Sequence, residues 1–231
     1  MPASLKHIDP DTPMGATLVA GGATFRCWAP HAKAVYVVGD FNHRIRNDAA
    51  LLTRDQQGHW RGFFPGVKDR QRYMFYVVGE GSEGLKRDPY ARELESPFPA
   101  ECLIRRTDFP WHESGYVTPP FHEFVIYQLH VGTFFTPNLP HKGGTFLDVA
   151  RKLPYLADLG VTALQLMPIQ EFQTSFSLGY NGTDYFSPEM DFAVADAELP
   201  AYVAEVNKLL DAKGLRRYHA ADLHGEMNHL K

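Results

Sequence analysis

Hydrophobic and polar residues alternate over the first part of the chain. Between residues 16 and 107, short β-rich runs are separated by turn residues such as Ala-Pro, Gly-Asp and Pro-Gly, with no helical pattern between them. Strands at this spacing are typical of a β-sandwich of about 90 residues. The predicted strands span residues 23–28, 34–38, 59–64, 72–78 and 101–105, with a turn at residues 79–84.

The pattern changes after residue 121. Mostly apolar runs at residues 125–131 and 161–167 predict strands that are buried on both faces of a sheet. A strand, a helix and a second parallel strand make a βαβ unit. Residues 199–210 predict another helix, and a further helix-like segment starts at residue 220. The helix between the two strands is indicated by apolar residues at steps of three and four: Phe146, Val149, Ala150, Leu153, Leu156 and Ala157.

Local signals mark the ends of that helix. Thr145 is expected to cap its start together with Asp148, and Gly160 to end it. Pro154 lies inside the pattern and is expected to kink or split the helix. After the second apolar strand, residues 177–188 are interpreted as a long aromatic loop.

These patterns divide the chain into four segments. Residues 1–15 are an extended lead-in, residues 16–107 the sandwich, residues 108–121 a linker, and residues 122–231 a domain of βα units. The linker is rich in proline, which favours extended backbone over helix. A β/α barrel needs eight βα units, and the last segment has room for about two of them.

The charge balance excludes some partners. The chain of 231 residues has 23 Lys and Arg against 27 Asp and Glu, a formal net charge of −4, and its basic residues are scattered. A mildly acidic chain has no electrostatic reason to bind nucleic acid or anionic lipid. No apolar run approaches the roughly 18 residues of a membrane span, and the N-terminus lacks the apolar core of a signal peptide. We therefore expect a cytoplasmic protein with no nucleic-acid or membrane partner.

The two cysteines, Cys27 and Cys102, both lie in strand-like contexts. One disulfide between them stays open, but the lack of a secretion signal favours two buried free thiols. No metal site and no cofactor are expected.

Sequence motifs in the second half resemble the α-amylase superfamily, glycoside hydrolase family 13. Residues 125–134, VIYQLHVGTF, resemble its first barrel strand, and residues 160–168, GVTALQLMP, resemble its second. Gly179-Tyr180 and the DYFSP run at residues 184–188 resemble the loop after that strand.

Motifs in the first half resemble the sandwich that precedes the barrel in branching enzymes, isoamylases and maltooligosyl-trehalose trehalohydrolases. They are FRCWAP at residues 25–30, GDFN at residues 39–42 and DPYA at residues 88–91. The resemblance implies a multi-domain fold. An N-terminal Ig-like β-sandwich, similar to carbohydrate-binding module 48, would precede the first βα units of an incomplete (β/α)8 TIM barrel.

The family's chemistry uses three carboxylates at the C-terminal ends of barrel strands. An Asp nucleophile and an acid Glu about 5–5.5 Å apart carry out retaining cleavage, and a second Asp grips the sugar. The motifs that supply them are absent from this sequence, so no catalytic residue is assigned. The nearest run, from Asp222 to Asn228, has five residues between Asp and Asn where the family has three.

The resemblance implies three substrate-binding candidates. Tyr180 matches the tyrosine that stacks on the sugar at the cleavage subsite, although it also fits a loop residue packed on the barrel rim. Asp184 is expected to order its loop by hydrogen bonds, and His130 to satisfy a buried hydrogen bond near the barrel mouth. Glu171 also lies in a barrel loop, but nothing in the sequence pairs with it as a general acid requires.

The sandwich departs from the family at one position. Sugar-binding versions carry Gly-Asp-Phe-Asn-x-Trp, whereas Arg44 stands here where the tryptophan would be. Trp28 and Trp60 lie in strand patterns and are predicted to be core residues. A packing role for the sandwich is therefore favoured over glycan binding.

Two functions stay open. In the first, the chain is the N-terminal portion of an enzyme that acts on α-1,4 or α-1,6 glucosidic bonds. Its substrate would be an α-glucan such as starch, glycogen or a maltooligosaccharide, and this portion would be inactive alone. Branching, debranching, trehalose-forming and hydrolytic activities are all compatible with it. The alternative is a non-catalytic glucan-binding or scaffold fragment. In either case, oligomers through an exposed barrel edge are expected, because two parallel strands leave a sheet edge uncovered.

Overall fold

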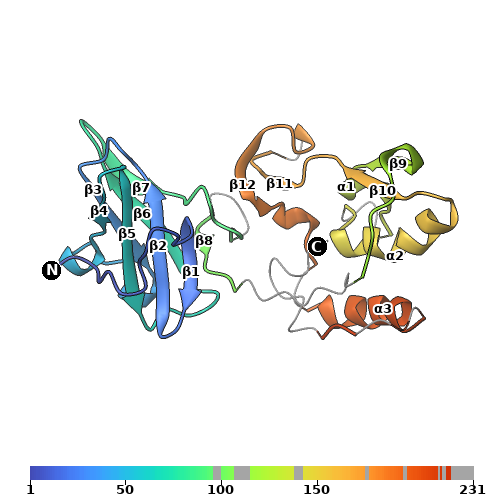
Figure 1. The fold of residues 1–231 in the computed structure, drawn as a ribbon, viewed down its shortest axis with the longest axis horizontal. Coiled ribbons are helices and arrows are strands. Elements are labelled where there is room, and N and C mark those ends of the chain that lie inside the picture. The colour runs from blue at the N-terminus through green and yellow to red at the C-terminus, as the bar shows by residue number, and fades with distance from the viewer. Residues whose placement is uncertain are drawn as a thin grey trace. The chain divides into compact units, whose positions relative to one another are not determined.

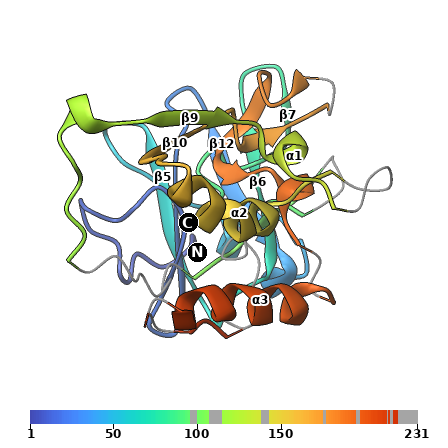
Figure 2. The same cartoon turned by 90° about the vertical axis from the view of Figure 1, so that its right-hand side faces the viewer.

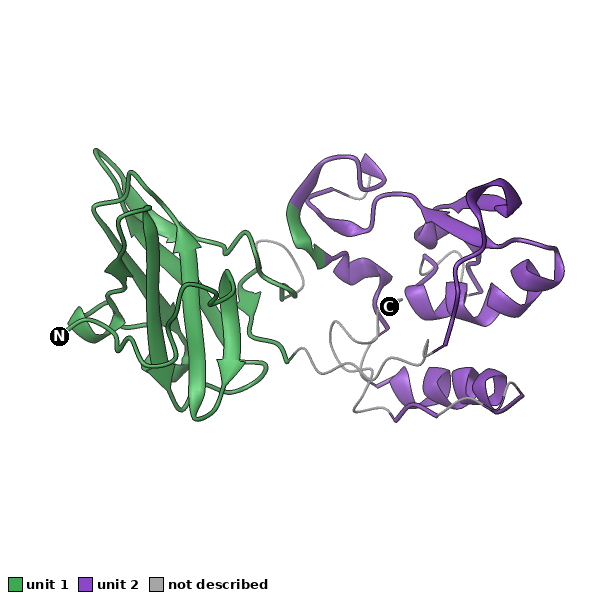
Figure 3. Cartoon of the chain, in the orientation of Figure 1, with its two compact units in different colours: residues 1–107, 184–187 green, residues 108–183, 188–231 purple. Residues whose placement is uncertain are grey.

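The chain forms two compact units. The computed structural model describes residues 1–95, 100–106, 115–137, 143–174, 177–194, 197–212, 214 and 217–219. Unit 1 contains Met1–Thr107 together with Asp184–Ser187, and unit 2 contains Asp108–Thr183 and Pro188–Lys231 (Figure 3). Of the expected linker, residues 108–114 lie outside the described residues, as does the helix-like segment that starts at residue 220.

Unit 1 is a sandwich of two antiparallel sheets (Figure 1). One sheet has the strand order β1-β2-β5-β4, and the other has the order β3-β6-β7, with β8 also paired to β6. The strands are β1 (Gly15–Val19), β2 (Gly22–Trp28), β3 (Ala34–Gly39), β4 (Thr53–Arg54), β5 (His59–Pro65), β6 (Arg72–Val78), β7 (Glu83–Lys86) and β8 (Cys102–Leu103). Two short 3₁₀ helices, Asp40–Asn42 and Asp48–Ala50, connect β3 to β4.

The sandwich core is built from inward-facing residues of both sheets. Phe25 of β2 is fully buried, and its ring centroid lies 5.3–5.5 Å from those of Phe41, Phe64 and Tyr73. Cys27 and Cys102 are both free and buried, as predicted. Burial raises the pKa of the Cys27 thiol to about 12, so this thiol stays protonated and unreactive at neutral pH.

The sandwich contains strands that the pattern did not predict. β7 begins inside the predicted turn at residues 79–84, and β8 is shorter than the predicted run of residues 101–105. The side chains of β7 are mostly exposed, so the strand lacks the apolar alternation that identifies half-buried strands. The expected lead-in also takes part in the sheet, because the N–H of Phe63 donates to the carbonyl of Ser4 at 2.7 Å.

The prediction for Trp28 is wrong, and that for Trp60 is confirmed. Trp60 is 5% exposed and its indole N–H donates to the carbonyl of Ala29, whereas Trp28 is 63% exposed. Side chains in a strand alternate between faces. Since Phe25 and Cys27 face the core, Trp28 is placed on the outer face of the same strand.

Unit 2 contains a parallel strand pair joined through a helix. β9 (Ile126–Leu129) pairs with β10 (Ala163–Leu166) in parallel, with Leu129 opposite Leu166, and helix α2 (Phe146–Asp158) lies between them in the chain. This confirms the predicted βαβ unit. Figure 2 shows helix α3 (Leu199–Ala212) beside α2, where the two helices share an apolar cluster. The remaining elements are α1 (Val131–Phe134), β11 (Gln170–Phe172), β12 (Gly182–Pro188) and 3₁₀ helices at Phe121–Glu123 and Met190–Phe192.

The start of α2 follows the predicted capping signal. The Asp148 N–H donates to Thr145 Oγ1 at 3.2 Å, and the Thr145 N–H donates to Asp148 Oδ2 at 3.0 Å, which makes a reciprocal capping box. The helix continues through Pro154, so the proline does not split it. It ends at Asp158, just before Gly160, whose φ of +90° suits a helix end.

The aromatic loop predicted at residues 177–188 is in part a strand. Residues Gly182–Pro188 form β12, which pairs with β11. Its middle residues, Asp184–Ser187, belong to unit 1, where the Ser187 hydroxyl donates to the carbonyl of Ala91 at 2.7 Å. Its aromatic residues Tyr185 and Phe186 are exposed, while Asp184 and Ser187 are buried, so the strand lacks the apolar alternation that would identify it. No helix within the described parts of the chain is long and apolar enough to cross a membrane.

Candidate functional site

A cavity of about 320 Å³ lies in unit 2 beside the end of β9. It contains one imidazole and one carboxylate among apolar walls, which is the composition of a small-molecule site. Its lining residues are His130, Gly143, Gly144, Phe172, Leu178, Asp191 and Phe192. Gly144 is required by close packing, since a Cβ there would lie 2.5 Å from the carbonyl oxygen of Phe135.

His130 follows β9 directly and begins helix α1. Its ring packs edge-on against Phe192 with centroids 5.6 Å apart, and Nδ1 lies 3.4 Å from the Thr133 hydroxyl. Burial lowers the pKa of His130 below its ordinary value, so the imidazole is neutral at pH 7. Among the described residues, the buried Nε2 atom has no hydrogen-bond partner. A neutral imidazole at this place can donate or accept one hydrogen bond from a ligand.

Tyr180 lies outside the lining of this cavity. Its side chain is 68% exposed, and its N–H donates to the carbonyl of Ser177 at 3.0 Å. The preceding Gly179 has a φ of +87°, and a Cβ there would lie 2.6 Å from the carbonyl oxygen of Pro168. Only glycine fits this turn, and the turn presents the Tyr180 ring to solvent.

Asp184 is buried in unit 1. The side chain is 4% exposed, and its Oδ2 atom lies 3.0 Å from Nη2 of Arg87. Asp184 thus pairs with Arg87 and does not line the cavity. Of the three predicted substrate-binding residues, only His130 lines the cavity, so the structure does not gather them around one pocket.

Glu171 is tied to the backbone of its own unit. Its Oε2 atom accepts from the N–H of Met190 at 3.3 Å. The neighbouring Glu189 accepts from the N–H groups of Phe172 and Asp191, and burial raises its pKa above the ordinary value. These carboxylates hold β11 against the residues that follow β12.

A buried polar cluster in unit 1 surrounds Asp88. The Tyr73 hydroxyl donates to Asp88 Oδ2 at 2.6 Å, and the Tyr90 N–H donates to Oδ1 at 2.9 Å. Burial, and to a smaller extent the charge of Asp184, raise the pKa of Asp88 to about 6 against the effect of these two donors. The only sequence signal for this cluster is the DPYA run, because no local pattern shows that Tyr73 lies beside it.

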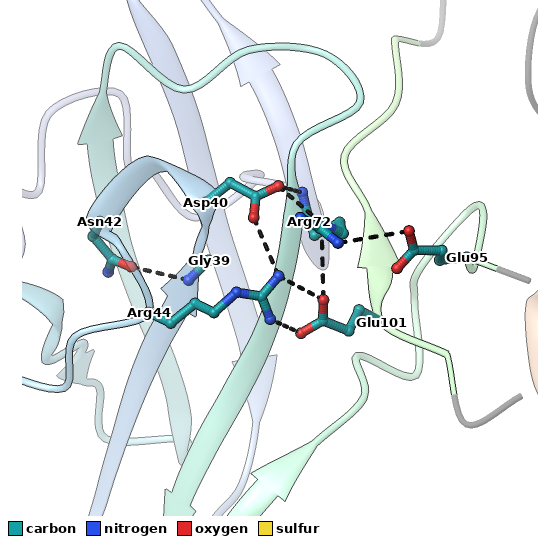
Figure 4. A network of polar contacts seen from close by, with 7 residues as sticks. All are labelled: Gly39, Asp40, Asn42, Arg44, Arg72, Glu95 and Glu101. Atoms are coloured by element: carbon teal, nitrogen blue, oxygen red, sulfur yellow. Dashed lines mark hydrogen bonds and ion pairs between the residues drawn. The ribbon is translucent and has the colours of Figure 1, made fainter.

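An ion network occupies the position where the family carries a sugar-binding tryptophan (Figure 4). The Arg44 guanidinium contacts both carboxylate oxygens of Glu101 and lies 3.1 Å from Asp40 Oδ1. Asp40 Oδ2 accepts from the backbone N–H of Arg72 at 2.9 Å and from its Nε at 3.1 Å. Burial acts to raise the pKa of Asp40, but these donors lower it below the ordinary value. Arg44 is thus held between two carboxylates and presents no aromatic surface.

Unit 1 matches a known class of domain. Residues 13–91, which contain β1 to β7, match the family of carbohydrate-binding module 48, the isoamylase N-terminal domain. The first unit is therefore an Ig-like β-sandwich of a carbohydrate-binding module.

Relatives of known activity match across both units. The 1,4-alpha-glucan branching enzyme of Lactiplantibacillus plantarum is 35% identical over 80% of this chain, which covers 30% of that enzyme. The branching enzyme of Corynebacterium jeikeium is 31% identical over 79% of the chain and 26% of its own length. The chain thus spans less than a third of these relatives.

Solved structures share the fold. A Salmonella typhimurium protein assigned as an alpha amylase has a TM-score of 0.65 at 24% identity, over 84% of this chain and 31% of its own. Pullulanase from Bacillus acidopullulyticus has a TM-score of 0.67 at 22% identity, over 87% of this chain and 28% of its own. The match to carbohydrate-binding module 48 and the branching enzymes identify the chain as the N-terminal part of a branching-enzyme-like protein of the α-amylase superfamily, glycoside hydrolase family 13.

Proposed function

We propose that this chain is the N-terminal portion of a retaining enzyme that cleaves or transfers α-1,4 or α-1,6 glucosidic bonds in an α-glucan. One observation carries the proposal: a carbohydrate-binding module is followed by a parallel βαβ unit, in the same order as in the branching enzymes. The similarity to branching enzymes favours transfer of glucan chains over plain hydrolysis as the reaction of the longer parent protein.

The uncovered faces of β9 support an incomplete (β/α)8 TIM barrel over residues 122–231. Ile126 and Tyr127 are 51% and 37% exposed, although β9 is an apolar strand paired in parallel with β10. Parallel sheets bury both faces in complete folds. Further barrel strands and helices would cover these side chains.

The exposed barrel edge also supports self-association of the 231-residue chain. An unpaired strand edge with apolar side chains templates further pairing. We expect multi-angle light scattering to give a mass above that of the monomer, rising with concentration. The double variant Ile126→Lys, Tyr127→Lys is expected to shift the population toward monomer, because charges block strand addition. A monodisperse monomer of the unaltered chain would rule out this association.

Tyr180 is proposed as a sugar platform. An aromatic face covers the apolar C–H face of a glucose ring while the hydroxyl groups bond to polar partners. Tyr180 follows the tightly packed Gly179 turn, and Asp184 orders the strand after it. His130 offers a neutral imidazole in the cavity beside β9. The Asp, Glu and Asp that carry the chemistry would come from barrel strands that follow these residues in the parent protein.

Replacement of Tyr180 tests this function in a protein extended by its downstream sequence to the length of the branching enzymes. Tyr180→Ala is expected to lower kcat/KM on amylose about tenfold or more, since about 1.4 kcal/mol of transition-state binding corresponds to a factor of ten. Tyr180→Phe keeps the ring and is expected to retain most activity. Rates are measured by iodine staining and by release of reducing sugar.

The same assay decides whether the parent is an enzyme. The 231-residue chain alone is expected to show no turnover on soluble starch. If the extended protein lacks an Asp, Glu and Asp set and has no activity, the enzyme proposal fails. The alternative, a non-catalytic glucan-binding or scaffold fragment, is favoured by the module match together with the lack of catalytic motifs. Turnover by the chain alone, free of contaminating amylase, would exclude that alternative.

A further inference from the structure

Trp28 is a large aromatic side chain exposed on the outer face of the β1-β2-β5-β4 sheet. Ala23, Phe25 and Cys27 of the same strand face the core, so alternation directs Trp28 away from it. Its 63% exposure leaves most of the indole open to solvent. Burying this ring within the sandwich would need the strand to shift register by one residue, which would expose Phe25.

The indole is held in a defined place. Its only donor, the Nε1–H, bonds to the carbonyl of Gln57 at 3.2 Å. The turn that carries Gln57 is fixed to the end of β2, because the Ala29 N–H donates to the carbonyl of Gly58 at 3.0 Å. Gly58 has a φ of +86°, and a Cβ there would lie 2.8 Å from Pro30. With its polar atom already satisfied, the ring offers an apolar face for a ligand.

Polar side chains stand beside the ring. His59 lies directly opposite Trp28 on β5. Asp55 Oδ1 accepts from the N–H groups of Gln57 and His59 at 2.9 Å, and its Oδ2 lies 3.4 Å from His59 Nδ1 and 3.9 Å from Arg61. Both signs of charge and an imidazole therefore lie on the strand that pairs with Trp28 and on the turn before it. This is the arrangement that sugar hydroxyl groups need around a stacked ring.

We propose that Trp28 is the stacking platform of an α-glucan-binding site on this sheet. The proposal rests on the substrate class proposed above and adds a place for it on the sandwich. Arg44, at the position of the family's tryptophan, lies after β3 in the opposite sheet and is held by Asp40 and Glu101. The two positions are on different sheets, so binding at Trp28 does not require the ion network to open.

The test measures binding of maltoheptaose and glycogen to the 231-residue chain. Two-dimensional ¹H–¹⁵N spectra follow the Trp28 indole N–H during titration with maltoheptaose, and native gels containing glycogen measure retardation. Trp28→Ala is expected to raise Kd about tenfold or more, whereas Trp28→Phe keeps an aromatic face and is expected to stay within about threefold of the unaltered chain. Leu85→Ala, at an exposed apolar position on β7 of the other sheet, is the matched control and is expected to bind normally. Tyr180→Ala is run in parallel, and cellohexaose, with β-linkages, is expected to bind weakly.

The outcomes separate this proposal from the proposed function. If Trp28→Ala binds as tightly as the unaltered chain, while Tyr180→Ala does not, the glucan site is elsewhere and the Trp28 proposal is wrong. If the chain binds no α-glucan, the Trp28 proposal is also overturned, since the site is complete in this chain. The proposed function is then still decided by the activity of the extended protein. A loss of α-glucan binding in Trp28→Ala but not in Leu85→Ala supports the proposal, provided that the Trp28 indole signal of the unaltered chain also shifts during titration.

Discussion

Replacement of Phe25 by alanine is expected to lower the free energy of unfolding of unit 1 by about 3–5 kcal/mol, as for large aromatic residues removed from a core. Phe25 is fully buried, and its ring meets those of Phe41, Phe64 and Tyr73 at centroid distances of 5.3–5.5 Å. The change removes both the transfer free energy of the ring and the contacts of its three aromatic neighbours. Urea unfolding, followed by circular dichroism and by the fluorescence of buried Trp60, measures the loss.

The control for Phe25 lies three residues away on the same strand. Trp28→Ala removes an even larger side chain, but from the outer face, and is expected to change stability by only about 0.5 kcal/mol or less. Equal losses for the two variants would mean that the inward and outward faces of β2 have been assigned wrongly.

Asp88 is expected to make the stability of unit 1 depend on pH between about pH 4 and pH 7. The pKa of Asp88 is raised from 3.8 to about 6 in the folded chain, with burial as the main cause. The folded state therefore binds this proton more tightly than the unfolded state does. The stabilisation from the proton is fully present below pH 3.8 and is lost as pH rises through 6. At about 1.4 kcal/mol for each pKa unit, the total change is about 3 kcal/mol.

Asp88→Asn isolates this contribution, because asparagine does not titrate. We expect the difference in unfolding free energy between the unaltered chain and Asp88→Asn to shift by about 2 kcal/mol from pH 4 to pH 7, since part of the full change lies below pH 4. The readout is this change with pH, since the amide also alters the hydrogen bonds from Tyr73 and Tyr90 at every pH. Asp11→Asn, at an exposed position, serves as the control. Parallel pH profiles for Asp88→Asn and the unaltered chain would show that Asp88 titrates normally.

Local sequence patterns predict much of the fold. The long β-rich runs became β2, β3, β5 and β6, and the helical period between two apolar runs became α2 between β9 and β10. These elements can be predicted because the burial of one face imposes a hydrophobic period of two residues on a strand and of 3.6 residues on a helix. β7 and β12 are not predicted by the pattern, because β7 is largely exposed and β12 exposes its aromatic residues while it buries Asp184 and Ser187.

The site residues were harder to predict. Sequence motifs singled out Tyr180, Asp184 and His130, but could not tell that Asp184 is buried against Arg87 while Tyr180 is open to solvent. For Trp28, alternation along the strand is sufficient: with Phe25 and Cys27 facing inward, Trp28 faces outward. The network of Arg44 and Glu101 joins residues 57 positions apart and has no local signature.

The discontinuity of unit 1 bears on how the chain folds as it is synthesised. The described strands β1 to β8 are all made by residue 103, yet Arg87, Tyr90 and Ala91 also contact Asp184, Phe186 and Ser187, which follow much later in the chain. About 80 residues, with the βαβ unit among them, are translated in between, and at roughly 5–20 residues per second this takes several seconds. During that interval the segment around Asp88 lacks the contacts from Asp184, Phe186 and Ser187. Unit 1 is therefore complete only after the βαβ unit of unit 2 has been made.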